Sequence, residues 1–197
     1  MTVTIRVYSD YVCPYCFLAE FPLREAVEGK DVEVEWMPFE LRPEPNPTLK
    51  PEGEYLQRAW AESVYPLAKQ MSVPIVLPRV SPQPHTHLAF EGFQYAKEHG
   101  KGNEYTDRMF RAFFQEEQDI GDVAVLTRLA GEVGLDGADY RQAVESRRYR
   151  EIHREALRHA IEEMKITSVP TFVIGEQLIP GLARKALLER AIDAASK

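Results

Sequence analysis

Asp10-Tyr11-Val12-Cys13-Pro14-Tyr15-Cys16 is the stretch that decides the fold, and it holds both cysteines of the 197-residue chain. An alternating apolar run at residues 3–7 precedes it, helical apolar spacing begins at Phe17, and a second alternating run spans residues 32–36. This order predicts a strand, a helix that starts at Cys13, and a second strand. In such a β-α-β unit, two cysteines separated by two residues are typical of a redox pair.

The spacing of the two cysteines has a chemical reason. The first backbone N–H groups of a helix lack intrahelical partners and the helix dipole is positive there, so a thiolate at Cys13 is favoured over a thiol. Pro14 falls at the first helical position, where its missing N–H costs nothing. Cys13 is therefore the predicted nucleophile and Cys16, one turn deeper, the resolving thiol, while the nearby charge of Asp10 opposes thiolate formation.

Three other roles are possible for the Cys13–Cys16 pair. Half a structural zinc site would need further ligands, and the chain offers only the His85-Thr86-His87 segment, whose spacing fits no common zinc finger. A structural disulfide between Cys13 and Cys16 would close too short a loop to stabilise much. Two unrelated buried thiols are the third reading. The position of the pair in a β-α-β unit favours redox chemistry, and we expect no metal site.

Composition bounds the class of protein. With 44% hydrophobic residues the chain is long enough for one domain, or for one domain carrying an insertion. A net charge of −7 disfavours nucleic acids and anionic membranes as partners. The sequence shows no signal peptide and no run approaching a membrane span, so we expect a cytoplasmic protein, in which a cycling pair is more plausible than a lasting disulfide.

Along the chain, the pattern is strand-like at both ends and helical between them. Thr171–Ile174 and Gln177–Ile179, joined by Gly175-Glu176, read as a hairpin. We predict an α/β thioredoxin fold, β-α-β then β-β-α, with residues 1–50 and 146–197 forming the thioredoxin-like domain and residues 51–145 an all-helical insertion. The predicted helices after the first are 52–67, 88–99, 105–117, 122–133, 136–144, 147–164 and 184–194, with Asp122 and Asp136 as N-caps.

The aromatic residues and histidines of the helical part carry little functional signal. Phe110, Phe113 and Phe114 lie at helical spacing, which by itself predicts burial in a core. His153 and His159 stand on a highly charged helix and are expected to face solvent or the boundary with the insertion.

Several motifs together resemble one family, the DsbA-like thioredoxin-fold oxidoreductases, and within it the FrnE-like cytoplasmic branch. The resemblance covers nearly the whole chain in order. It is carried by Ser9-Asp10-Tyr11-Val12-Cys13-Pro14-Tyr15-Cys16, by Pro38-Phe39-Glu40-Leu41, by Ile120-Gly121-Asp122 and by Val169-Pro170-Thr171-Phe172-Val173-Ile174.

The resemblance implies a second functional position, next to the third strand. The Val169–Pro170 bond is implied to be cis and to lie beside the cysteines, with Pro170 keeping metals off the thiols and the Val169 backbone pairing with an extended substrate. Pro14 and Tyr15 are implied to support the site, although the usual dipeptide of the FrnE-like branch is Pro-Trp and Pro-Tyr is more like glutaredoxins. The second cysteine pair of some FrnE-like proteins is absent, which excludes an internal thiol relay.

The leading functional hypothesis is a thiol–disulfide oxidoreductase, monomeric or homodimeric, acting on protein or small-molecule thiols and disulfides. It needs no cofactor besides the Cys13–Cys16 disulfide, and glutathione is a candidate reductant. A first alternative is a glutathione transferase of the kappa class or a hydroxychromene-carboxylate isomerase, which share the fold but typically carry serine at the position of Cys13. Whether glutathione serves as reductant or as ligand, its carboxylates would dock at the Val169 backbone and at Arg184. A second alternative is a chaperone that uses an apolar face of the insertion.

Overall fold

The computed structural model describes residues 2–197, and its centre is a four-stranded sheet in the order β2-β1-β3-β4. Strand β1 (Val3–Ser9) runs parallel to β2 (Val32–Pro38), and helix α1 (Pro14–Val27) joins them. Strands β3 (Thr171–Ile174) and β4 (Gln177–Pro180) form the antiparallel hairpin that the sequence predicts, and β3 pairs with β1.

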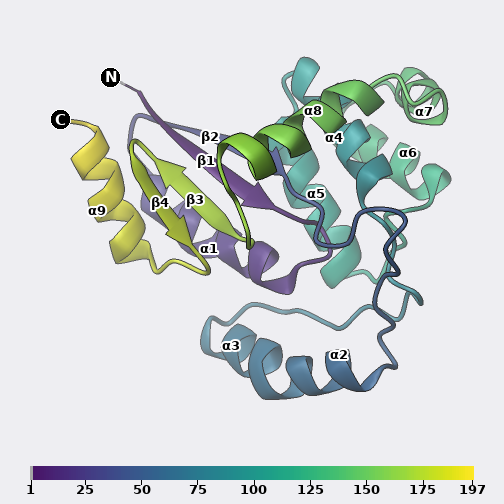
Figure 1. Ribbon diagram of the computed structural model, residues 1–197, viewed down its shortest axis with the longest axis horizontal. Coiled ribbons are helices and arrows are strands. Elements are labelled where there is room, and N and C mark those ends of the chain that lie inside the picture. The colour runs from purple at the N-terminus through teal and green to yellow at the C-terminus, as the bar shows by residue number, and fades with distance from the viewer. Residues whose placement is uncertain (1) are drawn as a thin grey trace.

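Helices cover both faces of the sheet (Figure 1). On one face, alternate residues such as Ile5 and Phe172 join the main core with α1 and with the terminal helix α9 (Lys185–Ala195). On the other face, Tyr8 and Val173 form a smaller cluster beneath α8 (Arg150–Arg158) and the π-helical turn η2 (His159–Glu163). This β-α-β and β-β-α arrangement confirms the predicted thioredoxin fold.

The segment between β2 and α8 is helical. Helix α2 (Glu54–Ala59), the π-helical turn η1 (Trp60–Val64) and α3 (Tyr65–Gln70) run on without a break, and we call residues 54–70 the helical arm. Four further helices follow. They are α4 (His87–Glu98), α5 (Gly102–Phe114), α6 (Val123–Glu132) and α7 (Gly137–Glu145). The side chains of Asp122 and Asp136 cap α6 and α7, as the sequence predicts.

Helix α5 ties the helical part to the sheet, because its aromatic stripe is buried against the first β-α-β unit. The ring of Phe114 stacks on that of Phe17 in α1, 5.6 Å between centroids. The ring of Phe110 lies 6.0 Å from Trp36 in β2 and 5.4 Å from Tyr11. Both parts of the chain therefore share one hydrophobic core.

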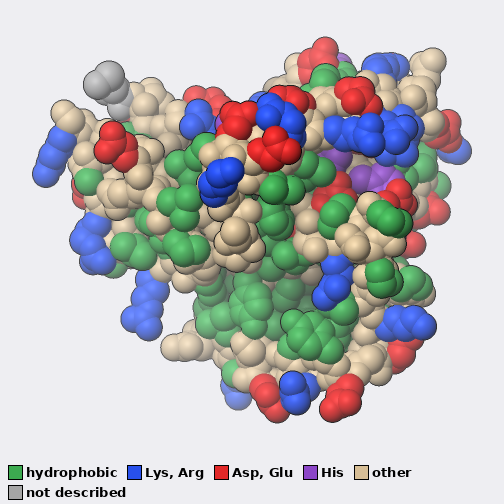
Figure 2. Space-filling view, viewed as in Figure 1, with side chains coloured by type: hydrophobic (Ala, Val, Ile, Leu, Met, Phe, Trp, Pro, Cys, Tyr) green, Lys and Arg blue, Asp and Glu red, His purple; other side chains and the backbone are tan. Residues whose placement is uncertain are grey.

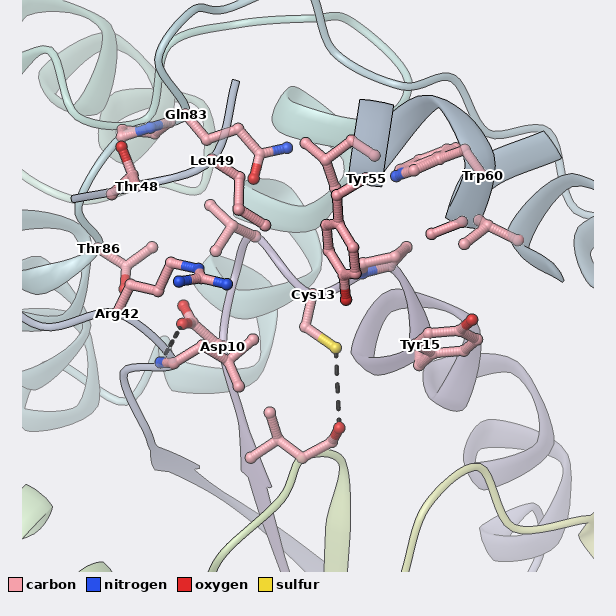
Figure 3. Close-up of a pocket in the computed structure, with 18 of the residues that line it drawn as sticks. Asp10, Cys13, Tyr15, Arg42, Thr48, Leu49, Tyr55, Trp60, Gln83 and Thr86 are labelled. Atoms are coloured by element: carbon pink, nitrogen blue, oxygen red, sulfur yellow. Dashed lines mark hydrogen bonds between the residues drawn. The ribbon is translucent and has the colours of Figure 1, made fainter. Parts of the chain in front are cut away.

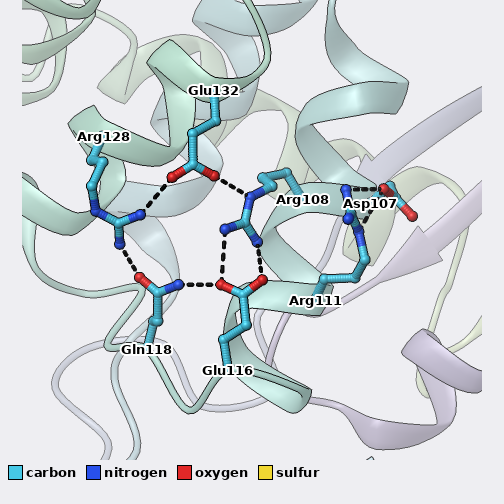
Figure 4. Close-up of polar contacts among 7 residues, drawn as sticks. All are labelled: Asp107, Arg108, Arg111, Glu116, Gln118, Arg128 and Glu132. Atoms are coloured by element: carbon cyan, nitrogen blue, oxygen red, sulfur yellow. Dashed lines mark hydrogen bonds and ion pairs between the residues drawn. The ribbon is translucent and has the colours of Figure 1, made fainter. Parts of the chain in front are cut away.

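Arg108 fixes α5 to α6 (Figure 4). Its guanidinium group contacts the carboxylates of Glu132, at 2.6 Å, and Glu116, at 2.8 Å, and Gln118 and Arg128 close the ring of polar contacts. Because the Arg108 side chain is largely buried, its charge needs these partners.

Two expectations about the helices are wrong in detail. The helix predicted from Arg147 begins at Arg150, because Arg147 itself has a left-handed backbone, φ 56°, while its side chain pairs with buried Glu91. In the helix predicted over 52–67, the apolar spacing groups Tyr55 with Leu56 and Trp60, whereas the structure leaves Tyr55 62% exposed. Of the two surroundings expected for His153, the structure shows the boundary with the insertion: the side chain is buried against α4, and its Nε2 lies 2.6 Å from Glu40 Oε1. Within residues 2–197, no helix has the length and hydropathy needed to cross a membrane.

Candidate active site

The two cysteines lie where β1 gives way to α1. Cys13 is the N-cap residue of α1, with an extended backbone (φ −90°, ψ 112°), and Pro14 occupies the first helical position. The Cys13 N–H donates to the Asp10 carbonyl at 3.1 Å, and the Cys16 N–H donates to the Cys13 carbonyl at 3.1 Å. Within residues 2–197 no side chain caps this helix, so the positive end of its dipole remains available to a negative charge at Cys13.

The two thiols differ in depth. Both are free, and Cys13 retains 5% of its surface exposed whereas Cys16 is fully buried. Burial raises the pKa of the Cys16 thiol well above its ordinary value, and a hydrogen bond with Cys13 raises it further; a hydrogen bond with the Asp10 backbone acts in the opposite direction. A nucleophile at the surface of a cavity with a protonated partner behind it suits stepwise thiol exchange.

The segment before β3 lies directly against Cys13, although 156 positions separate them in the chain. The Val169–Pro170 peptide bond is cis. The Cys13 thiol donates a long hydrogen bond, 3.8 Å, to the Val169 carbonyl, while the Pro170 carbonyl accepts from the Gly181 N–H at 2.7 Å. The fold therefore brings Val169 and Cys13 together across the end of the sheet.

A pocket of about 250 Å³ opens above Cys13 (Figure 3). One wall comes from the helical arm and is mainly apolar, with Tyr55 and Trp60. The opposite wall is polar and includes Arg42, Thr48, Gln83 and Thr86. In the space-filling view, hydrophobic side chains line a hollow between the arm and the body of the protein (Figure 2). The cavity thus offers an apolar side and a hydrogen-bonding side to a ligand whose sulfur meets Cys13.

Asp10 lies in the floor of this pocket, where the sequence revealed only its charge. Its carboxylate accepts a hydrogen bond from the Leu41 N–H at 2.8 Å, yet complete burial raises its pKa to about 7. Hydrogen bonds with the Leu41 backbone and with the Thr86 side chain lower the pKa of Asp10, and the charge of Glu40 raises it. In the sequence, only the position of Asp10 at the end of a strand, three residues before Cys13, indicates that its carboxyl group lies near the cysteines.

Tyr15 links the cysteine motif to the arm. Its hydroxyl is hydrogen-bonded to the hydroxyl of Ser63, 2.7 Å between the oxygens, and its side chain lines the pocket beside Pro14. Arg184, considered as a dock for glutathione, does not line this pocket and borders a separate depression beside Phe21.

The two histidines that were weighed as metal ligands have other surroundings. His85 lines the pocket, and its Nε2 is hydrogen-bonded to the Asn46 carbonyl at 2.8 Å. His87 borders a different depression near His153. Across residues 2–197, no cluster of three or more His, Cys, Asp or Glu side chains is arranged to bind a metal ion.

Comparison with known proteins places this site in a family context. The model of the DSBA-like thioredoxin domain matches residues 4–193. Over 194 residues the chain is 57% identical to YwbO of Bacillus subtilis (strain 168), covering 98% of this chain and 97% of that protein. YwbO is described as uncharacterised, so this likeness adds neither a family nor an activity.

Solved structures with the same fold include enzymes of two kinds, each aligned over 98% of this chain. The probable DsbA oxidoreductase SCO1869 of Streptomyces coelicolor matches with TM-score 0.84 at 22% identity, over 90% of its chain. A 2-hydroxychromene-2-carboxylate isomerase matches with TM-score 0.79 at 18% identity, over 96% of its chain. The cytosolic disulfide reductase DsbM of Pseudomonas aeruginosa, with GSH, matches with TM-score 0.70 at 20% identity, over 96% of its chain. With a family model spanning almost the whole sequence and a cysteine pair at the start of its first helix, the chain belongs to the DsbA-like thioredoxin family of oxidoreductases.

Proposed function

We propose that this protein exchanges disulfides with thiol substrates through Cys13 and Cys16. The proposal rests on one arrangement: Cys13 is the N-cap of α1 at the floor of a pocket, with Cys16 buried one turn deeper and the Val169 carbonyl on its other side. The helix N-terminus stabilises negative charge on the Cys13 sulfur, both when it attacks and when it leaves.

In the reductive half of the cycle, the Cys13 thiolate attacks one sulfur of the substrate disulfide. The substrate S–S bond breaks, and the leaving thiolate takes up a proton. Cys16, after losing its proton, attacks the Cys13 sulfur of the mixed disulfide and releases the second substrate thiol. The substrate gains two electrons, the Cys13–Cys16 disulfide forms, and two equivalents of a thiol such as glutathione, or one dithiol, restore the reduced pair.

The surroundings of Cys13 support roles for three further residues. Pro14 starts the helix with the geometry that Cys13 needs, and Tyr15 shapes the pocket. The Val169 carbonyl, which accepts the hydrogen bond of the Cys13 thiol, would instead accept one from a backbone N–H of the substrate. Adjacent Pro170 has no N–H to donate. No cofactor other than the cysteine pair is needed for this chemistry.

Replacement of each cysteine tests the mechanism. We expect Cys13→Ser to abolish reduction of a small disulfide by dithiothreitol above the uncatalysed rate. Cys16→Ser is expected to leave the first attack intact and to accumulate a mixed disulfide on Cys13, visible as a mass increase of one substrate thiol. Turnover that is unchanged in Cys13→Ser would end the proposal.

A glutathione-dependent isomerase or transferase is the second candidate. The enclosed pocket with one polar wall supports it, as does the similarity in fold to a hydroxychromene-carboxylate isomerase. The presence of Cys16 argues against it, because activation of glutathione's thiol needs no resolving cysteine. Isomerase turnover that survives Cys16→Ser, in the presence of glutathione, would favour this candidate over disulfide exchange.

For the setting, we propose the cytoplasm, where thiols are kept reduced and the pair would cycle. The resemblance to a reductase described as cytosolic is in line with this. We propose that the protein acts as a monomer or homodimer on thiols and disulfides and not on nucleic acids, given its net charge of −7.

A further inference from the structure

The helical arm is attached to the body mainly by one apolar stripe. Its buried residues Leu56, Trp60, Val64 and Ala68 recur every four positions and form a single face that packs on the main core, and the first three also line the pocket. At both ends the arm continues into irregular, proline-rich segments, residues 39–53 and 71–86. In Figure 1 these connections are the long loops that lead into α2 and out of α3, and the arm stands apart from the other helices.

Directional contacts between the arm and the body are few. Within residues 2–197, the hydrogen bond between Tyr15 and Ser63 is the single one that joins the arm's helices to anything beyond their adjoining loops, and no ion pair does so. The other two side-chain bonds of the arm, Gln57 to the Pro51 carbonyl and the Leu77 N–H to the Tyr65 hydroxyl, reach only those loops. A segment held by one apolar face and one hydrogen bond belongs to the less stable part of a fold.

The position of the arm decides what can reach Cys13. With the arm in place, Cys13 is 5% exposed and lines the pocket of about 250 Å³, whose other wall the arm forms. A small disulfide fits a cavity of this size. A disulfide on the surface of another protein brings bulky chain on both sides of its sulfurs, and it can approach the Cys13 Sγ only if the arm moves away.

We propose that the Tyr15–Ser63 hydrogen bond determines substrate specificity, by holding the arm over Cys13 and so favouring small-molecule disulfides over protein disulfides. The inference rests on the proposed disulfide exchange and names the substrate class of the same site. Tyr15 and Ser63 are positioning residues here. Their bond biases the equilibrium between a covered site, open to small disulfides, and an uncovered site, open to proteins as well.

Two single substitutions test the proposal. Tyr15→Phe keeps the ring and removes the hydroxyl, and Ser63→Ala removes the other partner without touching the cysteine motif. The measurement is kcat/KM for bis(2-hydroxyethyl) disulfide and for insulin, with dithiothreitol as the electron donor and Cys13→Ser as the blank. Loss of one hydrogen bond between neutral groups corresponds to about a fivefold change in an equilibrium, so we expect the insulin-to-small-disulfide ratio to rise about fivefold in both variants.

The double variant and a neighbouring control separate this bond from general damage. If the two hydroxyls act through each other, Tyr15→Phe with Ser63→Ala changes the ratio no more than either single substitution. Glu62→Gln, on an exposed residue next to Ser63, should leave the ratio at the wild-type value. Amide hydrogen exchange in residues 54–70 should become faster in both single variants and stay unchanged in Glu62→Gln.

The outcomes are distinct. A ratio unchanged in Ser63→Ala, or effects of the two substitutions that multiply, would overturn the inference even while Cys13-dependent turnover of the small disulfide stands. If the wild-type protein shows no Cys13-dependent turnover of either substrate, the proposed function itself fails, whatever the exchange measurements show.

Discussion

Glu20, about one turn along α1 from Cys16, is a carboxyl group placed in an apolar environment. Its side chain is almost fully buried, and Oε2 has no hydrogen-bond partner in the described part of the chain. Burial raises the pKa of Glu20 to about 8, the charge of Asp107 adds to the rise, and Arg24 and Arg111 oppose it. Near neutral pH the native protein therefore keeps this group largely protonated.

The consequence for stability has a definite sign. An unfolded chain releases the Glu20 proton near the ordinary value of 4.5, whereas the native state holds it up to about pH 8. Between these values the native state binds more protons, so the contribution of Glu20 makes the protein less stable as pH rises. We expect Glu20→Gln to stabilise the protein at pH 9 by on the order of 2 kcal/mol and to have little effect at pH 4. Urea unfolding at both pH values measures this, and an equal effect at the two would contradict it.

At the same scale, sequence reasoning was strongest where chemistry depends on neighbours in the chain. The placement of Cys13, Pro14 and Cys16 at the start of a helix follows from local rules and was predicted. The contact of Tyr15 with Ser63 joins positions 48 apart and left no local pattern. The contact of His153 with Glu40, from a loop 113 positions away, left no local pattern either, although the boundary with the insertion was one of the two surroundings expected for His153.

Among the helices, α4, α5 and α7 meet at Gly92. A Cβ atom there would lie 2.1 Å from the Tyr140 hydroxyl and 2.4 Å from the Tyr105 hydroxyl. These two hydroxyls are hydrogen-bonded to each other at 2.7 Å, and that of Tyr105 donates to the Ala89 carbonyl at 2.8 Å. The absence of a side chain at Gly92 is what allows the three helices to approach and this buried pair to form.

Two glycine substitutions provide a matched test of that packing. Gly92→Ala inserts a methyl group among fixed rings and should destabilise the protein by about 2–4 kcal/mol. Gly131→Ala lies in α6 with nothing within 4 Å of the new Cβ, and should stabilise it by about 0.5–1 kcal/mol through better helix propensity. Thermal and urea unfolding measure both, and a neutral Gly92→Ala would show that the helices can shift apart.

Elements were predictable where both ends carried a local signal. The hairpin at Gly175-Glu176 and the helices capped by Asp122 and Asp136 lie where the sequence places them. The helix expected from Arg147 begins three residues late, because the side chain of Arg147 turns to the buried carboxylate of Glu91 and its backbone takes a left-handed conformation. A tertiary ion pair of this kind overrides helical periodicity.

For the whole molecule, the shared core has a consequence for unfolding. Phe17, Trp36 and Tyr11 of the first β-α-β unit contact Phe110 and Phe114 of α5. We therefore expect the sheet and helices α4–α7 to unfold together, with one urea transition that coincides in far-UV and near-UV circular dichroism. A fragment covering residues 51–145 should show no cooperative transition. Two separated transitions in the full chain would mean that the insertion is stable by itself.

The overall architecture followed from the sequence because the two ends of the chain carry the patterns of a β-α-β unit and of a β-β-α unit, the order of elements in a thioredoxin fold. The path of the proline-rich segments did not, since residues 39–53 and 71–86 have no periodicity to read. The wall that the helical arm builds over Cys13 depends on those segments. The cysteines could be found from the sequence, and the shape of the space above them could not.

Tyr15 stands between the two cysteines and also touches Ser63 in the arm. A substitution at Tyr15 that is made to change the oxidising strength of the cysteine pair will therefore also change how the helical arm packs over Cys13. On the proposed mechanism, the redox potential of the cysteine pair and the selection between small and protein disulfides both depend on the Tyr15 side chain. A substitution at position 15 therefore changes both.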